Sequence, residues 1–191
     1  MAENDSSGNM QPTPAVFPDY AAPIVRNQGG ARQLALVRWG MPAPPQYLEG
    51  KKTDPGVTNI RNVNSAHWRR WLAVENRCVV PFTSFSENEV IPDCSWPPIW
   101  FSFNETRPLP FFARIWTLKW TSVRKFKEGA VTVSLSGFIT TNPNKLVGTY
   151  HPKAMPMILT THEEIDLWMT APIKEGWRYE DLLPTTHCLS L

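Results

Sequence analysis

The chain has 191 residues, of which 42% are hydrophobic and 19% are charged. This is the composition of a globular domain that buries its own core, and it excludes an intrinsically disordered chain. The net charge of +2 permits a nucleic-acid partner but does not by itself predict one. Nineteen prolines predict irregular connections and few long helices.

The cysteine content and the hydropathy further restrict the class of protein and its cellular compartment. Cys78, Cys94 and Cys188 are widely separated and form no zinc-binding pattern with histidine, so we expect no metal and no cofactor. An odd number of cysteines favours a reducing, cytoplasmic compartment. Glu3 and Asp5 stand where a signal peptide carries positive charge, and no apolar run approaches the ~18 to 20 residues of a membrane span. We therefore expect no export and no membrane partner.

The N-terminal part of the chain predicts a tail followed by a hairpin. Residues 1–16 are rich in Ser, Asn, Gly and Pro and are expected to be disordered, so that one domain spans residues 17–191. Residues 24–26 and 34–39 have the pattern of two strands. The Asn/Gly-rich residues 27–30 between them are a hairpin signal.

The rest of the chain combines short strands with two short helices. One helix is expected over residues 65–74 with Ser65 as its N-cap, and another begins at Thr161, where Glu164 completes a capping box. Strands are expected at residues 78–82, 99–103, 111–116, 131–140 and 157–159. The predicted fold class is α+β, a single domain on a β-rich, barrel-like core.

Four polar residues near these strands are candidate acid, base or binding groups. On an extended strand Asn59 and Arg61 project from the same face, an arrangement that suits a sugar-phosphate, although a surface turn has the same pattern. Glu87 follows an apolar strand and is either a buried general acid or base or an exposed loop glutamate. His151 is a candidate for proton transfer near neutral pH, but a lone histidine is more often structural.

A second group of residues mixes basic and aromatic side chains. Arg69 and Arg70 lie between Trp68 and Trp71, and further lysines, arginines and tryptophans follow in residues 116–127. Single-stranded nucleic acid is bound by cations that contact phosphates and rings that stack on bases. The alternative is a solvated basic face above a tryptophan-rich core.

In their order and spacing, several short segments resemble the SRAP family, the SOS response-associated peptidases or abasic site processing proteins. The segments are residues 18–26, the Arg-Trp-Gly-Met run that contains Arg38 and Trp39, Asn59-Ile60-Arg61, residues 77–87 ending in Glu87, and residues 138–159 with His151. Each motif alone is weak, and the resemblance depends on all of them together, over residues 17–184.

The resemblance implies a fold, a substrate and a site. The fold is a single SRAP-type domain with a mixed, mostly antiparallel, barrel-like β core and a few short helices. Family members bind abasic sites in single-stranded DNA and cross-link to the ring-opened sugar aldehyde. An N-terminal cysteine forms a Schiff base with its α-amine and closes a thiazolidine ring with its thiol.

Residue roles follow from the same resemblance. Asn59, Glu87 and His151 are implied to be catalytic. DNA contacts are implied for Arg61, Trp39, Arg38, Arg69, Arg70 and Lys153. The implied partner is single-stranded DNA that contains abasic sites, bound by a cytoplasmic monomer that associates with the nucleoid when on DNA.

The chain departs from the family pattern at its start. The family opens Met-Cys, whereas this chain has Ala2 and reaches the early family segment after a polar tail. We therefore expect the segment with the catalytic cysteine to be missing and the covalent and autopeptidase chemistry to be impaired. Three alternatives stay open: a reversible Schiff base on the amine of Ala2, an inactive single-stranded-DNA-binding module or truncated gene product, and an in-frame Met-Cys encoded upstream.

Overall fold

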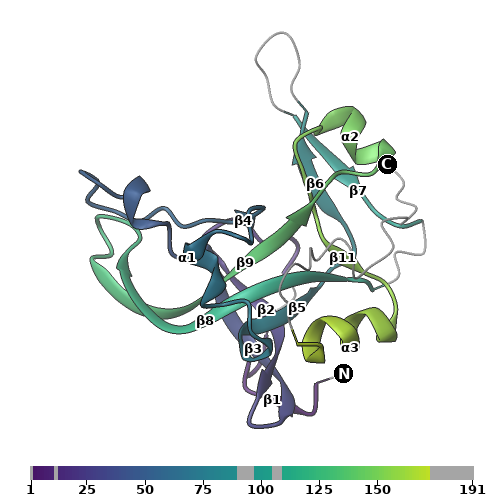
Figure 1. Cartoon of the computed structure of the whole chain (residues 1–191), viewed down its shortest axis with the longest axis horizontal. Helices are drawn as coiled ribbons and strands as arrows, with labels where there is room; N and C mark the ends of the chain where they lie inside the picture. The colour runs from purple at the N-terminus through teal and green to yellow at the C-terminus, as the bar shows by residue number, and fades with distance from the viewer. Residues whose placement is uncertain (1, 11–12, 90–96, 105–108, 173–191) are drawn as a thin grey trace.

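The computed structural model describes residues 2–10, 13–89, 97–104 and 109–172 (Figure 1). Its strands are β1 (Asn4–Asp5), β2 (Ala21–Gln28), β3 (Ala31–Trp39), β4 (Asn59–Ile60), β5 (Arg77–Pro81), β6 (Phe85–Asn88), β7 (Pro98–Phe101), β8 (Phe111–Val123), β9 (Ala130–Thr141), β10 (Met155–Pro156) and β11 (Ile158–Leu159). Its helices are α1 (Ala66–Arg69), α2 (Lys145–Tyr150) and α3 (His162–Thr170), with 3-10 turns η1 (Pro45–Tyr47) and η2 (Val74–Asn76). None of the helices in these ranges has the length and apolar character needed to cross a bilayer.

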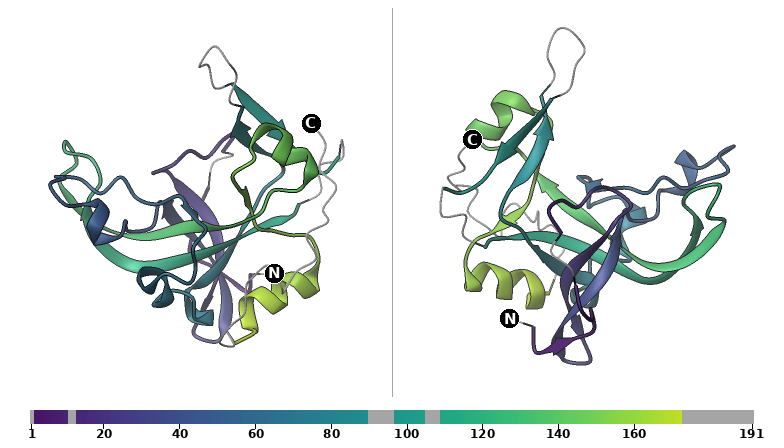
Figure 2. Two further views of the ribbon diagram at one scale, coloured as in Figure 1. Left: turned by 45° about the horizontal axis from the view of Figure 1, so that its top comes forward. Right: turned by 180° about the vertical axis from the view of Figure 1, so that it is seen from behind.

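A mixed sheet closes on itself into a five-stranded barrel. The pairing order runs β3, β2, β5, β8, β9, and β9 then pairs with β3. Neighbours along this path are antiparallel, whereas the closing β3–β9 pair is parallel, with Arg38 opposite Leu135. Figure 2 shows the β8–β9 hairpin curving away from the barrel on one side. The expected α+β fold with a mixed, mostly antiparallel barrel is therefore confirmed.

The predicted N-terminal hairpin is present and longer than its sequence signal. β2 and β3 pair from Ala21 opposite Arg38 to Gln28 opposite Ala31. The turn between them contains Gly29 and Gly30, with φ of 62° and 83°, which glycine adopts without steric penalty. The two glycines thus permit the reversal that sets the register of both strands.

Both predicted helix caps are present, although one helix is short. The Thr161 hydroxyl accepts the N–H of Glu164 and the Glu164 carboxylate accepts the N–H of Thr161, both at 3.1 Å, which is the expected capping box. The Ser65 side chain accepts the N–H of His67 at 3.4 Å and caps α1. α1 ends at Arg69, so the helix expected to reach residue 74 is wrong in length.

Several short elements were not predicted from the sequence. Asn4 of β1 pairs with Gln33 of β3, so part of the segment expected to be disordered forms a strand, while the domain boundary at residue 17 stays a prediction. β4 and β10 contain two residues each and β6 contains four, too few to produce a recognisable alternation. These elements depend on pairing partners that are distant in the sequence.

Side chains of the barrel strands pack on two opposite sides. Along β8, Phe112 and Trp116 belong to one cluster and Ala113 and Ile115 to another, as alternation along a strand requires. We call the first the aromatic cluster, after Phe82, Phe85, Phe101, Phe112, Trp116 and Phe138. The second, the helix-side cluster, includes Trp68, Trp71, Leu72, Ile165, Trp168 and Met169 from α1, α3 and their surroundings.

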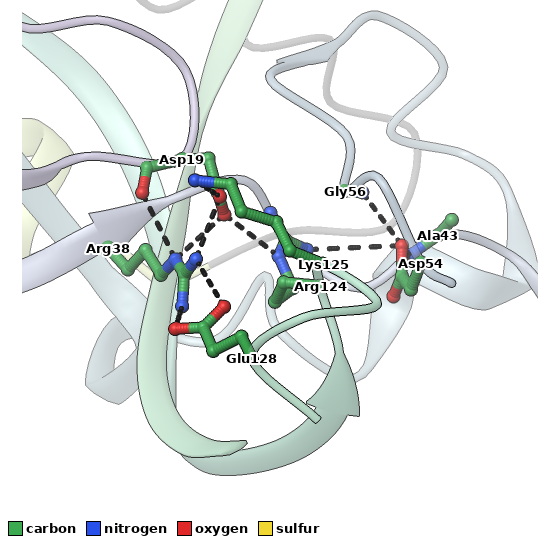
Figure 3. Close-up of polar contacts among 8 residues, drawn as sticks. All are labelled: Asp19, Arg38, Ala43, Asp54, Gly56, Arg124, Lys125 and Glu128. Atoms are coloured by element: carbon green, nitrogen blue, oxygen red, sulfur yellow. Dashed lines mark hydrogen bonds and ion pairs between the residues drawn. The ribbon is translucent and has the colours of Figure 1, made fainter. Parts of the chain in front are cut away.

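A buried ion cluster ties the β8–β9 turn to the loop before β4 (Figure 3). Nε of Arg124 donates to Oδ1 of Asp19 at 3.1 Å, and Nη1 lies 3.9 Å from Oδ1 of Asp54. The guanidinium lies against Gly40 and Gly56, whose φ angles are 135° and 78°. A Cβ at either glycine would come within 2.2 Å of Nη2 of Arg124. Both positions therefore require glycine for backbone conformation and for close approach.

Gly56→Ala should destabilise the protein more than Gly50→Ala. Gly50 also has a positive φ of 70°, but nothing lies within 4 Å of the position that a Cβ would take there, so that variant loses about 1–2 kcal/mol from backbone strain alone. Gly56→Ala adds overpacking against Arg124, worth about 1–3 kcal/mol more. Chemical denaturation measures both free energies of unfolding, and equal losses would contradict the packing described for Arg124.

Candidate functional site

Three segments that are far apart in the sequence meet at the end of β9. Asn59 of β4 lies parallel to Phe138, whose N–H donates to the carbonyl of Thr58 at 2.8 Å. Met155 of β10 pairs antiparallel with Thr141. These pairings bring the Asn59 segment and the chain that follows His151 to the same end of one strand.

Arg61 links two of these segments. One guanidinium nitrogen donates to the carbonyls of Thr141 and Lys153, and the other donates to the side-chain oxygen of Asn142. All three acceptors are neutral, and no carboxylate of the described ranges lies within ion-pair distance. The exposed guanidinium is thus held in place while its positive charge is left uncompensated, which suits it to contact a phosphate.

Glu87 and His151 face each other across the gap between β6 and α2. Oε2 of Glu87 lies 3.9 Å from Nδ1 of His151, and the side chains are 19% and 27% exposed. This distance is too long for a direct hydrogen bond. Proton transfer between the two groups therefore requires a water molecule or a substrate atom between them.

The aromatic cluster supports both groups. Glu87 pairs with Ile99 in the β6–β7 hairpin, and the neighbouring Phe85 stacks on Phe101 with ring centroids 5.3 Å apart. Phe101 also lies 6.1 Å from the ring of Tyr150, the last residue of α2. His151 closes that helix by donating its N–H to Val147 at 2.7 Å. The hairpin and the helix are thus oriented through one shared aromatic side chain.

Burial shifts the pKa of Glu87 in the direction that acid/base work needs. Removal from water raises the pKa of this carboxyl, and the nearby His151 imidazole opposes part of that rise. A carboxyl with a raised pKa releases and takes up a proton closer to neutral pH than an exposed glutamate does. The structure therefore shows Glu87 as a partly buried strand residue and not as an exposed loop residue.

Arg114 is a buried cation that sequence analysis did not single out. It is 2% exposed, and its guanidinium lies 3.6 Å from the Phe138 ring centroid and 4.8 Å from that of Trp39. Nη1 donates to Oγ of Ser136 at 3.2 Å, while Nε is buried without a hydrogen-bond partner in the described part of the chain. Burial lowers the pKa of Arg114 to about 9. The sequence signal that could have identified Arg114 is a charged residue inside the otherwise apolar residues 111–116.

Strand register places Arg114 in one row with the site. Asn59 is opposite Phe138, and Phe138 is opposite Arg114. Register partners project from the same face of a sheet, so these three side chains share one face. Trp39 joins them: its ring packs edge-on against Phe138 at 4.9 Å and its Nε1 donates to the Thr58 carbonyl at 3.3 Å.

Of the other predicted DNA contacts, Arg38, Arg69 and Arg70 lie outside this group of residues, and Lys153 lies next to Arg61. Arg38 donates to Asp19 and Glu128, and these carboxylates raise the pKa of its guanidinium. Arg70 donates to a backbone carbonyl of its own helix and lies over Trp71, and Arg69 is exposed on the same short helix. Lys153 is exposed beside Arg61, which contacts its carbonyl.

Two further observations complete the description of the site. The buried hydroxyl of Thr141 has no hydrogen-bond partner among the described residues, and sequence analysis did not identify it as a site group. Within those residues no group of three or more His, Cys, Asp or Glu side chains is arranged to hold a metal ion. Cys94 and Cys188 lie outside the described residues, and Cys78 is a buried free thiol.

Comparisons with known proteins find a family and relatives that resemble most of the chain. The family described as SOS response associated peptidase (SRAP) matches residues 1–188. The abasic site processing protein YoaM of Bacillus subtilis (strain 168) is 27% identical over 165 residues, which cover 85% of this chain and 67% of that protein. The abasic site processing protein YoqW of the same organism is 27% identical over 159 residues, covering 82% and 66%. The chain thus spans about two thirds of the length of these relatives.

Solved structures share the fold. A protein from Bordetella bronchiseptica superposes with a TM-score of 0.63 at 20% identity, over 92% of this chain and 84% of that one. A protein from Bacteroides thetaiotaomicron gives a TM-score of 0.63 at 20% identity, over 90% and 72%. At this level of identity the similarity concerns the arrangement of strands and helices.

Glu87→Gln should change how stability depends on pH. A raised folded-state pKa means that the wild-type carboxyl stabilises the fold most below its ordinary pKa of about 4.3 and loses that contribution as pH rises through the folded value. The glutamine variant does not titrate at this position. Its free energy of unfolding should therefore rise relative to that of the wild type as the pH increases from 4 to 8. Urea denaturation across this range measures the difference. Glu49→Gln, at an exposed loop position, is the control and should give a smaller pH-dependent difference.

Proposed function

Because the chain belongs to the SOS response associated peptidase (SRAP) family, we propose that it is an abasic-site processing protein that binds abasic sites in single-stranded DNA. The main support is a chain of contacts that links the four candidate residues. Asn59 pairs with β9, and Arg61 donates to the carbonyl of Lys153. Lys153 lies two residues after His151, which is 3.9 Å from Glu87. In this proposal the sugar of the abasic site lies against Glu87 and His151, with one of its oxygens within hydrogen-bond reach of both groups. Arg61 binds an adjacent phosphate, and Asn59 donates or accepts hydrogen bonds at the sugar.

The proposed chemistry begins at the aldehyde of the ring-opened sugar. An amine attacks C1′, the oxygen leaves as water, and an imine links protein to DNA. Protonation of the leaving oxygen and removal of the amine protons are assigned to Glu87 and His151, whose 3.9 Å separation supports transfer through an intervening group. A thiol on the same residue as the amine would add to the imine carbon and close a thiazolidine.

For the chain with Ala2 we propose that the covalent chemistry is impaired. After hydrolysis of the Met1–Ala2 peptide bond, alanine offers an α-amine but no thiol, so an imine formed there stays reversible. The position of β1 adds to this argument, because Asn4 and Asp5 pair with Gln33 and Leu34, near the turn of the β2–β3 hairpin and away from Trp39. These two observations favour a second candidate function, a non-covalent binder of abasic single-stranded DNA.

Arg61→Ala should weaken binding to an abasic single-stranded oligonucleotide roughly tenfold or more, because a charge-assisted hydrogen bond to phosphate contributes about 1.5–3 kcal/mol. Asn59→Ala should also weaken binding. Fluorescence anisotropy at several salt concentrations measures the affinities, and the salt dependence of Arg61→Ala should be shallower by about one ion. Arg32→Ala is the control, because it also removes one positive charge. Arg32 lies at the end of β3 away from Trp39 and pairs with the exposed Asp166, so this variant should bind like wild type. Equal affinities for all these proteins would argue against the site.

Borohydride trapping separates the covalent from the non-covalent function. We expect no adduct that survives denaturation without reductant, and a minor adduct with reductant whose yield falls in Glu87→Gln. Gel electrophoresis of labelled abasic oligonucleotide measures both. A stable adduct without reductant contradicts the proposed impairment. If the wild type with reductant gives no more adduct than Arg61→Ala does, the chain has the non-covalent function.

A further inference from the structure

The turn between β8 and β9 presents an exposed aromatic side chain between two lysines. Phe126 is 75% exposed, the highest value among the large hydrophobic residues described, and it lies between Lys125 and Lys127. The N–H of Glu128 donates to the carbonyl of Lys125 at 3.0 Å, which places Phe126 and Lys127 at the centre of a tight turn. An aromatic residue at this position contributes little to the core.

The turn is anchored at both ends by ion pairs of Lys125 and Glu128 (Figure 3). Lys125 pairs with Asp19 at 2.9 Å, and Glu128 accepts from Arg38 at 2.9 and 3.0 Å. Arg124, the residue before the turn, is buried against Gly40 and Gly56. These contacts hold the ends of the turn and leave Phe126 facing outward. Binding through such a preorganised element loses little conformational freedom.

Exposed aromatic side chains continue from the turn towards the candidate site. Phe17 and Tyr20 flank Asp19 in the sequence, are both more than half exposed, and contact each other edge-on at 5.9 Å. The carbonyl of Tyr20 accepts the N–H of Trp39 at 2.8 Å. Trp39 in turn reaches Thr58, next to Asn59. The ion pair of Asp19 with Lys125 therefore joins the turn to an aromatic path that ends at the site.

The charges around this path favour a polyanion. Asp19 and Glu128 are already paired with Arg38, Arg124 and Lys125. The Lys125 side chain nonetheless remains 60% exposed, and Lys127 is also exposed. Lys51 and Lys52 add positive charge from the adjoining loop, which is tied to β8 by a 2.8 Å hydrogen bond from Asp54 N–H to the Val123 carbonyl. Cations interspersed with aromatic rings bind single strands.

We propose that the β8–β9 turn is a second contact for single-stranded DNA, in which Phe126 stacks on a base and Lys125 and Lys127 contact phosphates on one side of the abasic site. This inference rests on the proposed function and extends it to the flanking strand. Along β9, Ala130 and Phe138 are separated by at most roughly 26 Å, at ~3.3 Å per residue. A strand that extends several nucleotides beyond the abasic site is therefore long enough to reach the turn.

Two oligonucleotides test the inference, one of ~5 nucleotides and one of ~16 nucleotides, each with a central abasic analogue. Phe126→Ala should bind the long oligonucleotide roughly tenfold more weakly than wild type and the short one equally well, because stacking on one base is lost. Phe126→Trp should retain wild-type affinity for both. Leu36→Ala removes an exposed apolar side chain from β3 and is the matched control. Thermal unfolding of Phe126→Ala should match wild type.

The outcomes separate this inference from the proposed function. If wild type binds both oligonucleotides and Phe126→Ala loses nothing on the long one, the second contact is wrong while the site stands. Equal losses of affinity for both oligonucleotides would mean that Phe126 supports the fold and does not make a second DNA contact. If wild type binds neither, both proposals fall. If the protein self-associates without DNA and Phe126→Ala abolishes this self-association, the turn binds a second copy of the chain. The proposed DNA contact is then wrong.

Discussion

β9 hydrogen-bonds to β8, β3, β4 and β10, and the polar groups of the candidate site reach their positions through these pairings. Asn59 is placed by the parallel pairing of β4, and the chain around His151 is placed between α2 and β10. Arg61 then bridges the two by donating to carbonyls on either side. The site is therefore built from short segments on one long strand, so that small elements with little stability of their own are held in a fixed relation.

Two ionisable side chains near the candidate site have little contact with water. Arg114 lies against the rings of Trp39 and Phe138, and among the described residues its guanidinium donates one hydrogen bond, to Ser136. Glu87 is largely removed from water next to His151. Burying an unpaired charge is unfavourable, and the faces of aromatic rings offset only part of that free energy. Local violations of the burial rule are expected where a protein binds or reacts. The aromatic cluster thus supplies both the packing of the barrel and the low-polarity surroundings of the site.

Local sequence signals predicted much of the fold, because the conformation of some segments depends mainly on their own residues. The glycine pair at residues 29 and 30 sets a hairpin, and Thr161 with Glu164 begins α3. The closure of the barrel through β3 and β9 has no local signal, since it joins Arg38 to Leu135 across almost a hundred residues. For the same reason the ion pairs that occupy Arg38, and the tethered turn that exposes Phe126, were not predicted. The grouping of Asn59, Arg61, Glu87 and His151 was expected only through a family resemblance, because their proximity depends on strand pairing.

The proposed binding of the abasic sugar at the end of β9 is tested most directly by amide chemical shifts. Two-dimensional NMR of the labelled protein should be recorded during titration with an abasic single-stranded oligonucleotide. The largest shift changes should fall on Asn59, Arg61, Glu87, His151 and their neighbours on β9. Shift changes confined to α1 and α3, or none at all, would contradict it.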